Sequence, residues 1–264
     1  IGVITYSYRS MPHNVEQLIQ FVKDSGICAI ELMDGPVEEY VGKPKLRSEL
    51  RAWRTSVSLD KFKEVKKMFD KAGIEIYAYK TNALRESASD AEIEYALKVT
   101  KILGAKSINP EITDNAAHTK RLGELGAKHK VFISYHAHLQ ASDTAWDVAL
   151  AQSPYNAMNI DIAHYAAVGG KNTKESLLKL IEKHHKRITS MHIKDRLTMD
   201  KGGARTTWGE GDTPIKEVLN LLKTKKYDIP ATIEIEHTIP DDSNAVKEVK
   251  KCFEYCKKIL LERT

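Results

Sequence analysis

The sequence predicts one α/β domain over residues 1–264 with the (β/α)8 architecture of a TIM barrel. Short β-branched runs alternate with longer amphipathic runs along the whole chain, and eight such pairs in about 250 residues are typical of this barrel. No Pro- or Ser-rich linker interrupts the alternation. No GxGxxG motif follows the first strand, as it would in a doubly wound dinucleotide-binding sheet.

The eight units can be assigned from the period of the apolar residues. The strand candidates are residues 1–7, 27–32, 74–80, 106–109, 130–136, 157–162, 188–194 and 231–236. The helix candidates are residues 14–24, 60–72, 90–103, 114–128, 143–150, 173–185, 215–223 and 243–262. Gly73 and Gly104 are expected to end helices just before strands. Thr213 is expected to be a helix N-cap, with Pro214 at the first helical position.

One long insertion, residues 33–58, follows the second strand. Its sequence, MDGPVEEYVGKPKLRSELRAWRTSVS, predicts an amphipathic or loop-like stretch. In a barrel, the connection after a strand lies on the side where substrates enter. We therefore expect the insertion on that side.

Composition and charge exclude several classes of protein. Apolar residues make up 42% of the chain and charged residues 29%, as in ordinary globular proteins. The net charge of +5, from 41 basic and 36 acidic residues, is too mild to predict a nucleic-acid partner. The chain has no apolar run of about 18 residues, so no membrane span is expected. Its three cysteines are too few and too scattered for a disulfide framework or a zinc ribbon.

These features predict a cytoplasmic protein that acts on a small molecule and binds neither nucleic acid nor membrane. Because the chain starts at Ile1, already inside a strand-like run, an exported form with a removed leader stays open. The sequence equally allows a homo-oligomer.

The last four strand candidates all end with polar side chains on one face. Alternate side chains of an extended chain point the same way. In the run ITSMHIK, His192 and Lys194 therefore share a face, opposite the apolar residues. The other three runs place His136, Asp161 and Glu234 on the equivalent face. Barrel enzymes carry their chemistry at the C-terminal ends of the strands, so we expect these side chains to meet in the lumen.

Two imidazoles and two carboxylates in one lumen predict a divalent metal ion. A buried polar group without a partner costs ~2–7 kcal/mol, and an isolated carboxylate costs far more. A cation removes this cost and leaves positions open for substrate oxygens or water. Asn109 and Glu111, after the fourth strand, could join the site, whereas Glu31 is expected to be structural or peripheral. The ligands that we expect are His136, Asp161, His192 and Glu234.

Several motifs resemble the sugar phosphate isomerase/epimerase superfamily of xylose isomerase-like barrels. They are YHAH (135–138), DIAHYAAVGG (161–170), MHIKD (191–195), WGEGD (208–212) and IEIEH (233–237). The resemblance covers nearly the whole chain, from GVITYSYR (2–9) to the last helix. The nearest subgroup has an aromatic-His-x-His motif on strand five and includes inosose dehydratase-like proteins.

The resemblance implies one divalent ion, such as manganese, magnesium, cobalt or zinc, held by one residue from each of the last four strands. Those residues are the same four ligands. It also implies that His164 contacts a substrate hydroxyl and that Lys194 lies near a substrate carbonyl or hydroxyl. Many epimerases have Glu where this chain has His136, so Glu236, Glu111, His138 or Lys194 would have to move the proton. The expected catalytic residues are Lys194, Glu236 and Glu111, and the expected substrate contacts are His138, His164, Asn109 and Trp208.

The predicted function is a metal-dependent sugar or polyol isomerase or epimerase that removes a proton next to a carbonyl and forms an enediolate. A first alternative is a lyase or dehydratase, or a hydrolase-type elimination, on a keto-sugar or inosose at the same site. A second alternative is a non-catalytic sugar-binding barrel. The apurinic endonuclease branch of the superfamily needs a multi-zinc cluster and a basic DNA-facing surface, which this composition does not favour.

Overall fold

The computed structural model describes residues 1–262 and confirms the predicted (β/α)8 barrel. Within these residues, parallel strands pair in chain order and close when β8 pairs with β1. The strands are β1 (Gly2–Ile4), β2 (Ala29–Met33), β3 (Glu75–Lys80), β4 (Ser107–Ile108), β5 (Phe132–His136), β6 (Asn156–Asp161), β7 (Ile188–Ile193) and β8 (Ala231–Ile233).

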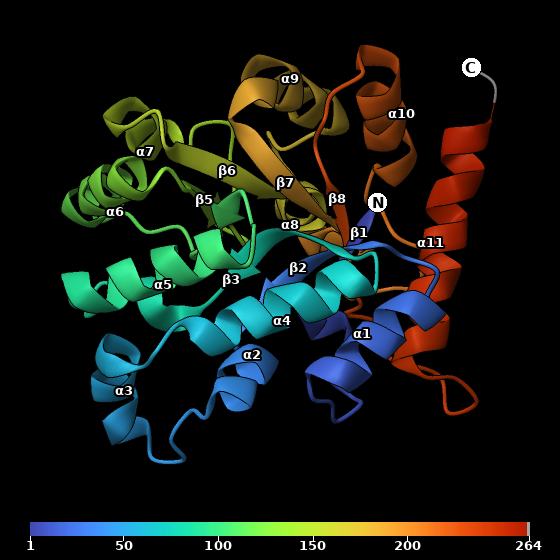
Figure 1. Cartoon of the computed structure of the whole chain (residues 1–264). Helices are drawn as coiled ribbons and strands as arrows, with labels where there is room; N and C mark the ends of the chain where they lie inside the picture. Colours follow the sequence, from blue (N-terminus) through green and yellow to red (C-terminus); the bar gives the residue numbers. More distant parts are fainter. Residues whose placement is uncertain (263–264) are drawn as a thin grey trace.

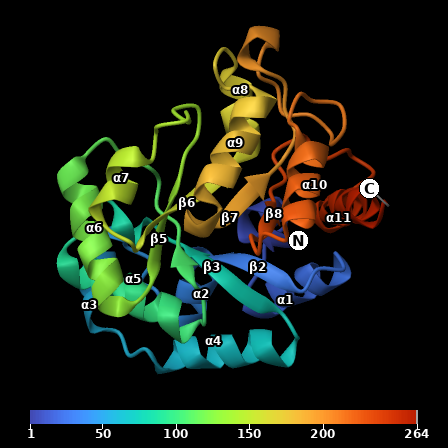
Figure 2. The same cartoon turned by 90° about the horizontal axis from the view of Figure 1, so that it is seen from above.

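Helices surround the strands, as two perpendicular views show (Figures 1 and 2). They are α1 (Val15–Asp24), α2 (Asp34–Val41), α3 (Leu50–Ser56), α4 (Asp60–Lys71), α5 (Asp90–Ile102), α6 (Ala116–His129), α7 (Asp147–Gln152), α8 (Ile162–Val168), α9 (Lys174–His184), α10 (Ile215–Lys225) and α11 (Ala245–Leu261). Short 3-10 helices cover Thr5–Tyr8, Arg47–Glu49, Asn82–Leu84, His185–Arg187 and Met199–Lys201.

The polar faces of the last strands line the interior of the barrel. Ser134, Asn159, Ser190 and Thr232 are all fully buried. Nδ2 of Asn159 donates to Oγ of Ser190 over 2.7 Å, and the hydroxyl of Thr232 is hydrogen-bonded to that of Tyr77 over 2.8 Å, so these buried polar groups have partners. The apolar residues that alternate with them, such as Ile160, are also fully buried. This is the arrangement of barrel strands that are covered on both faces.

Strands β1 and β8 are shorter than the predicted runs 1–7 and 231–236. A serine side chain explains the difference, because Oγ of Ser7 donates to the carbonyl of Ile233 and accepts from the N–H of Ile235. The hydroxyl thus replaces backbone pairing at this seam of the barrel. The chain beyond Ile233, which carries Glu234 and Glu236, continues outside β8.

Two of the three expected helix boundaries are confirmed. Gly73 and Gly104 have φ values of 70° and 78°, as expected after helices. The prediction of Thr213 as an N-cap is wrong, because α10 begins one residue later, at Ile215, with Pro214 before it and no side-chain cap. Thr213 instead donates its N–H to the Asp195 carboxylate, which ties the preceding loop to the end of β7.

The insertion 33–58 is mainly helical rather than loop-like, since it holds α2 and α3. A buried arginine joins the two helices. Arg54 on α3 forms two hydrogen bonds to the carboxylate of Glu38 on α2, at 2.8 and 3.0 Å. Tyr95 of α5 donates to the same carboxylate. The insertion is thereby fixed to the barrel's helical layer.

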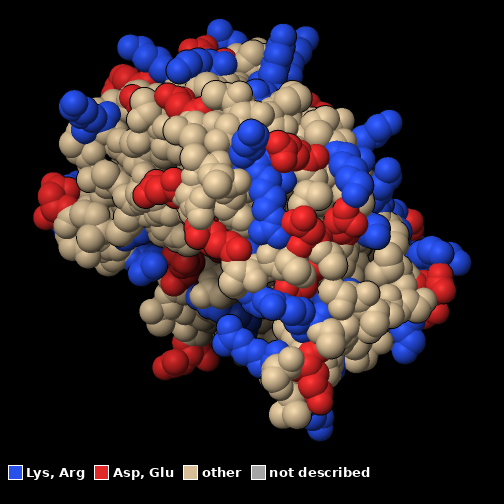
Figure 3. Space-filling view, turned by 90° about the vertical axis from the view of Figure 1, so that its left-hand side faces the viewer, with Lys and Arg blue, Asp and Glu red and all other residues tan. Residues whose placement is uncertain are grey.

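Charged residues cover the surface in a mixed pattern. On the face drawn in Figure 3, Lys and Arg side chains are interspersed with Asp and Glu side chains. Among the helices of residues 1–262, none is both long enough and apolar enough to cross a membrane.

Candidate metal and substrate site

Neighbouring strand ends bring the predicted metal ligands together. In the strand register, His136 lies opposite Asn159, and Asp161 lies opposite His192. The ligand atoms offered by His136, Asp161 and His192 lie within 4.8 Å of one another, and all three residues are buried. Glu234 joins them through Oε2, which lies 3.1 Å from Nδ1 of His192. We call this set of four residues the inner position.

His136 is a neutral imidazole with one nitrogen free. Its Nδ1 lies 2.8 Å from Oδ1 of Asn159 on the next strand. Because a carbonyl oxygen only accepts, Nδ1 carries the proton and Nε2 keeps its lone pair. Burial, together with the nearby Lys80 and His192, holds the pKa of His136 well below its usual value. A metal ligand needs this state, and an amide partner of this kind orients ligating histidines.

His192 is held by carboxylates at both nitrogens. Nε2 lies 2.9 Å from Glu31, and Nδ1 lies 3.1 Å from Glu234. Burial alone would lower the pKa of His192, but the two carboxylates outweigh it and raise the pKa to about 10. The ring is therefore an imidazolium that donates twice. With Nδ1 deprotonated, His192 and Glu234 would be among the residues that hold a divalent ion, while Glu31 keeps its hydrogen bond to Nε2.

Asp161 has one committed oxygen and one that faces the site. Oδ1 caps α8 by accepting from the backbone N–H groups of Ala163 and His164. Oδ2 forms no hydrogen bond to the residues of 1–262, although Nζ of Lys194 lies 2.8 Å away. Burial tends to raise the pKa of Asp161, but Lys194 and His164 lower it overall. This oxygen would suit a metal ligand, in competition with the Lys194 ammonium.

Lys194 lies among carboxylates rather than beside an open space. Its Nζ lies 2.8 Å from Asp161, 2.5 Å from Glu234 and 3.3 Å from Glu236. The side chain is buried, which would lower its pKa, but the three carboxylates raise the pKa instead. Lys194 is thus an ammonium ion that neutralises the acidic side chains of the inner position.

The inner position fits a divalent cation. It offers an imidazole nitrogen with an available lone pair, a carboxylate oxygen that pairs with Lys194, a second histidine and a second carboxylate. This mixed nitrogen and oxygen set suits zinc, cobalt or manganese. Two internal cations, Lys194 and the His192 imidazolium, balance part of the acidic charge in its absence.

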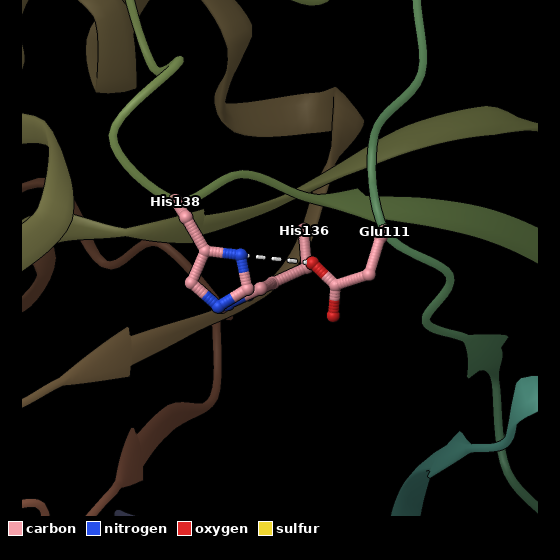
Figure 4. Close-up of side chains that lie close together, drawn as sticks. All are labelled: Glu111, His136 and His138. Atoms are coloured by element: carbon pink, nitrogen blue, oxygen red, sulfur yellow. Dashed lines mark ion pairs between the residues drawn. The ribbon is translucent and has the colours of Figure 1, made fainter.

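A second group of residues lies at the rim of the barrel. Glu111, after β4, lies 3.0 Å from Nδ1 of His138 and 2.8 Å from Nζ of Lys80. Burial opposes ionisation, but His138 and Lys80 lower the pKa of Glu111 to about 2, so it is a carboxylate. Figure 4 shows its side chain facing His138, with His136 close to both.

His164 and Glu236 complete the polar surroundings. Arg196 donates to Nδ1 of His164 over 2.9 Å, which leaves the proton on Nε2, 3.7 Å from Asp161. Burial lowers the pKa of His164 to about 4, so this ring is neutral. Glu236 lies between two cations, Lys194 and Arg205, the latter 3.1 Å away.

Two expected substrate contacts form no hydrogen bond or ion pair with these groups within residues 1–262. Asn109 is buried, and its Oδ1 accepts from Ser107, while its Nδ2 has no partner within residues 1–262. Trp208 is also buried, and its ring packs edge-on against Tyr255 of α11, with centroids 5.9 Å apart. Their roles toward a substrate stay predictions.

Sequence reasoning missed several residues that hold the site. Glu31 lies in the site itself, where it fixes His192, although it was expected to be structural or peripheral. In the run ICAIEL, Glu31 lies between two apolar residues and so on the opposite face of the strand, which was a signal that it faces the lumen. Asn159 has the same signal in the run MNIDI. Lys80 ends the predicted strand 74–80, which is a signal for a place near the rim, whereas Arg196 and Arg205 had none, because only the fold brings them to their partners.

A cavity of about 380 Å³ borders the rim beside Glu111. It lies between the segments that follow β3 and β4, and its walls include polar side chains of both charge signs. The lining residues that matter here are Asn82, Arg85, Glu86, Glu111 and Thr113. Among the residues of the two groups described above, Glu111 is the one that lines this cavity.

The chain belongs to the xylose isomerase-like TIM barrel family, whose model matches residues 19–258. This finding confirms the resemblance that the motifs indicated. A search of curated proteins found no match.

Solved structures similar to this chain share its fold at low sequence identity. The zinc-bound IOLI protein has a TM-score of 0.72 and 15% identity, with 98% of this chain and 96% of that chain covered. The probable 3-DHS dehydratase AsbF from Bacillus anthracis has a TM-score of 0.69 and 15% identity, covering 100% and 99%. A sugar phosphate isomerase/epimerase from Parabacteroides distasonis has a TM-score of 0.67 and 17% identity, covering 97% and 92%.

Proposed function

We propose that this protein is a divalent-metal-dependent sugar or polyol isomerase or epimerase that removes a proton from the carbon next to a carbonyl. The observation that carries the proposal is the grouping of His136, Asp161 and His192 within 4.8 Å, with Glu234 beside them. Membership of the xylose isomerase-like family supports it.

The four inner residues would hold the ion. When bound there, a divalent ion supplies Lewis acidity that polarises a substrate carbonyl and acidifies the neighbouring C–H bond. Asn159 keeps Nε2 of His136 free for this purpose, and Glu31 orients His192. These two partners would maintain the geometry of the ligands.

His138 is the best base among the residues that could move the proton. Lys194 is protonated, and the low pKa of Glu111 makes it a weak base. His138 is half-exposed, and Glu111 accepts the proton on its Nδ1, which leaves Nε2 free to take a proton from the substrate. A carboxylate that orients an imidazole in this way is common to many general bases.

Lys194 and His164 would bind the oxygens of the reacting carbons. The Lys194 ammonium can stabilise the negative charge that develops on an enediolate oxygen. The Nε2–H of His164 can donate to a neighbouring hydroxyl, since Arg196 fixes its other nitrogen. Return of the proton from His138 to the adjacent carbon gives the isomer. Epimerisation needs a donor on the opposite face, and Glu236 is the remaining carboxylate near Lys194.

Elimination is the second candidate function. A single imidazole base, without the strand-five Glu of many epimerases, suits removal of one proton followed by loss of an oxygen substituent β to the carbonyl. The similar fold of a probable dehydratase agrees with this possibility. Both reactions begin with the same proton removal.

Solvent exchange tests the common step. Protein stripped with a chelator and reloaded with Mn²⁺, Co²⁺, Zn²⁺ or Mg²⁺ is incubated in D2O with ketoses, inososes and 3-keto-sugars, and products are analysed by mass spectrometry. We expect deuterium at one substrate carbon or an eliminated product. His138→Gln should slow the reaction by about 10²–10⁴-fold, whereas His129→Gln on α6 should not.

Absence of deuterium and of elimination products from every substrate would contradict the proposal. Tight binding of a sugar without any turnover would instead favour the non-catalytic barrel.

A further inference from the structure

We propose that Glu111, His136 and His138 form a second position for a divalent transition-metal cation, at the rim of the barrel (Figure 4). We call it the rim position. The ligand atoms of these three residues lie within 4.8 Å of one another. His136 is common to the rim and inner positions, so the two sites meet at one side chain.

The backbone brings the rim residues together. Beyond β4, Glu111 forms an isolated parallel bridge with His136. The N–H of His136 donates to the carbonyl of Pro110 over 2.9 Å, and the N–H of Ile112 donates to the carbonyl of His136 over 2.8 Å. His138 follows two residues after His136, so both imidazoles leave the chain near Glu111. The rings are perpendicular, with centroids 4.8 Å apart.

The donor atoms at the rim are already aligned. Lys80 pairs with Oε1 of Glu111, which leaves Oε2 to face Nδ1 of His138 at 3.0 Å. A cation that replaces the proton on this nitrogen would bridge His138 and Glu111. With Nε2 of His136 it would have two nitrogens and one carboxylate oxygen, a set that binds zinc and similar ions while leaving a position open.

Only one ion can use His136 at a time. Asn159 occupies its Nδ1, so a single nitrogen serves both positions. The rim and inner positions are therefore alternatives for one ion. The rim position is the more accessible, because the side chains of His138 and Glu111 are 48% and 50% exposed, whereas Lys194 and the His192 hydrogen bonds fill the inner position.

The rim position therefore receives an ion from solvent before it moves inward. While an ion is at the rim, His138 is a ligand and cannot act as a base. This inference concerns metal binding itself, so it does not depend on the proposed reaction.

Co²⁺ binding to chelator-stripped protein tests the proposal, with the stoichiometry measured by equilibrium dialysis and the geometry by visible absorption. Asp161→Asn weakens only the inner position, so we expect it to retain one Co²⁺ per chain. Adding Glu111→Gln or His138→Gln to that variant should lower the affinity at least tenfold. His136→Ala alone should weaken binding more than any of these single changes, since it removes the shared ligand.

Glu86→Gln is the matched control, because Glu86 lies at the same rim and its hydrogen bonds within residues 1–262 go to Thr113 and Asn115. Long-range ¹H–¹⁵N spectra of Asp161→Asn add a second readout, since Zn²⁺ held at the rim of this variant must shift the ring nitrogens of His138. The proposal is overturned if Asp161→Asn binds no Co²⁺. It is also overturned if adding Glu111→Gln or His138→Gln leaves the Co²⁺ affinity unchanged, or if the His138 ring nitrogens do not shift. These measurements use no substrate. An ion can therefore be found at the rim even if the protein catalyses no reaction, and catalysis can be found even if no ion binds at the rim.

Discussion

The partners of each histidine decide what that histidine can do in this site. His136 has an amide oxygen at one nitrogen and remains neutral, whereas His192 has a carboxylate at each nitrogen and is protonated. Both residues lie on the polar faces of predicted strands, β5 and β7, and the sequence offers no reason to separate them. The difference comes from Glu31, which approaches from β2 across the lumen.

The first prediction concerns the pH dependence set by His192. The pKa of His192 is about 10 in the metal-free fold and about 6.5 in an unfolded chain. A raised folded pKa contributes stability that is fully present below about pH 6.5 and lost as the pH rises toward 10. We expect the free energy of unfolding to fall over this range by up to about 1.4 kcal/mol per pH unit.

Urea unfolding at several pH values, with a chelator present, measures this slope. His192→Gln should remove the part of the pH dependence of stability that comes from His192. Equal slopes for the two proteins between pH 7 and 10 would show that His192 is not protonated in the fold.

The second prediction concerns Lys194, which competes with a metal ion for Asp161 and Glu234. Lys194→Met leaves these buried carboxylates without a cation, so the metal-free variant should lose about 3–5 kcal/mol of stability. The same change should raise the affinity for Mn²⁺ by about tenfold, or about 1.4 kcal/mol. Electron paramagnetic resonance of free Mn²⁺ gives the affinity.

Lys201→Met provides the control, because Lys201 pairs with Asp212 at the surface, where its side chain is 56% exposed. Lys201→Met should measurably change neither the stability nor the Mn²⁺ affinity. Weaker Mn²⁺ binding in Lys194→Met would mean that the ammonium supports the ion instead of competing with it.

At the scale of elements, side-chain hydrogen bonds hold together segments that backbone pairing does not join. Ser7 bonds the chain on both sides of Glu234, and so places this ligand just beyond β8. The Asp195 carboxylate accepts from the N–H groups of Gly209, Gly211 and Thr213, which folds the WGEGD loop beside β7. These contacts shape the rim without contributing ligands.

The third prediction concerns the docking of the insertion through Arg54. Its guanidinium bonds both oxygens of Glu38, as well as Asn82 and Asp34, and its side chain is buried. Arg54→Met leaves Glu38 buried without a cation and should cost about 3–5 kcal/mol. Urea denaturation measures the loss.

Arg51→Met on the same helix is the matched control. Arg51 pairs with Glu92 but is 56% exposed, so its loss should cost less than about 1 kcal/mol. Equal losses for the two variants would show that the Arg54 network does not hold the insertion in place.

At the scale of the whole molecule, the ion and the fold stabilise each other, because the ligands come from strands that meet only in the closed barrel. The fourth prediction is that an ion at one hundred times its Kd adds about 2.7 kcal/mol to the stability. For a chain of this size, that corresponds to a rise in Tm of roughly 5–10 °C. Thermal unfolding monitored by circular dichroism measures the rise, and a chelator should reverse it.

The same experiment with Asp161→Asn should show a smaller rise. A Tm that is unaffected by Mn²⁺, Co²⁺ and Zn²⁺ would contradict binding to the folded state.

The sequence by itself determined the barrel and the direction of its polar faces. The eight strands fall within the predicted runs apart from a residue at the ends of β2 and β6, and the last four carry His136, Asp161, His192 and Glu234 toward one region. Period-two alternation and strand–helix order are local properties, so the residues alone reveal them. The helices of the insertion and the start of α10 were missed, because packing and the Asp195 loop decide them.

Only the tertiary structure decided the charge and the pairing of the site residues. Three sets of contacts join strands or loops that are distant in sequence. They are those of Lys194 with its three carboxylates, of Glu31 with His192 and of Glu111 with His138. Protonation depends on burial and on the nearest charges in space, within a few ångströms. A linear sequence contains neither quantity until the closed barrel brings its strand ends to a common rim.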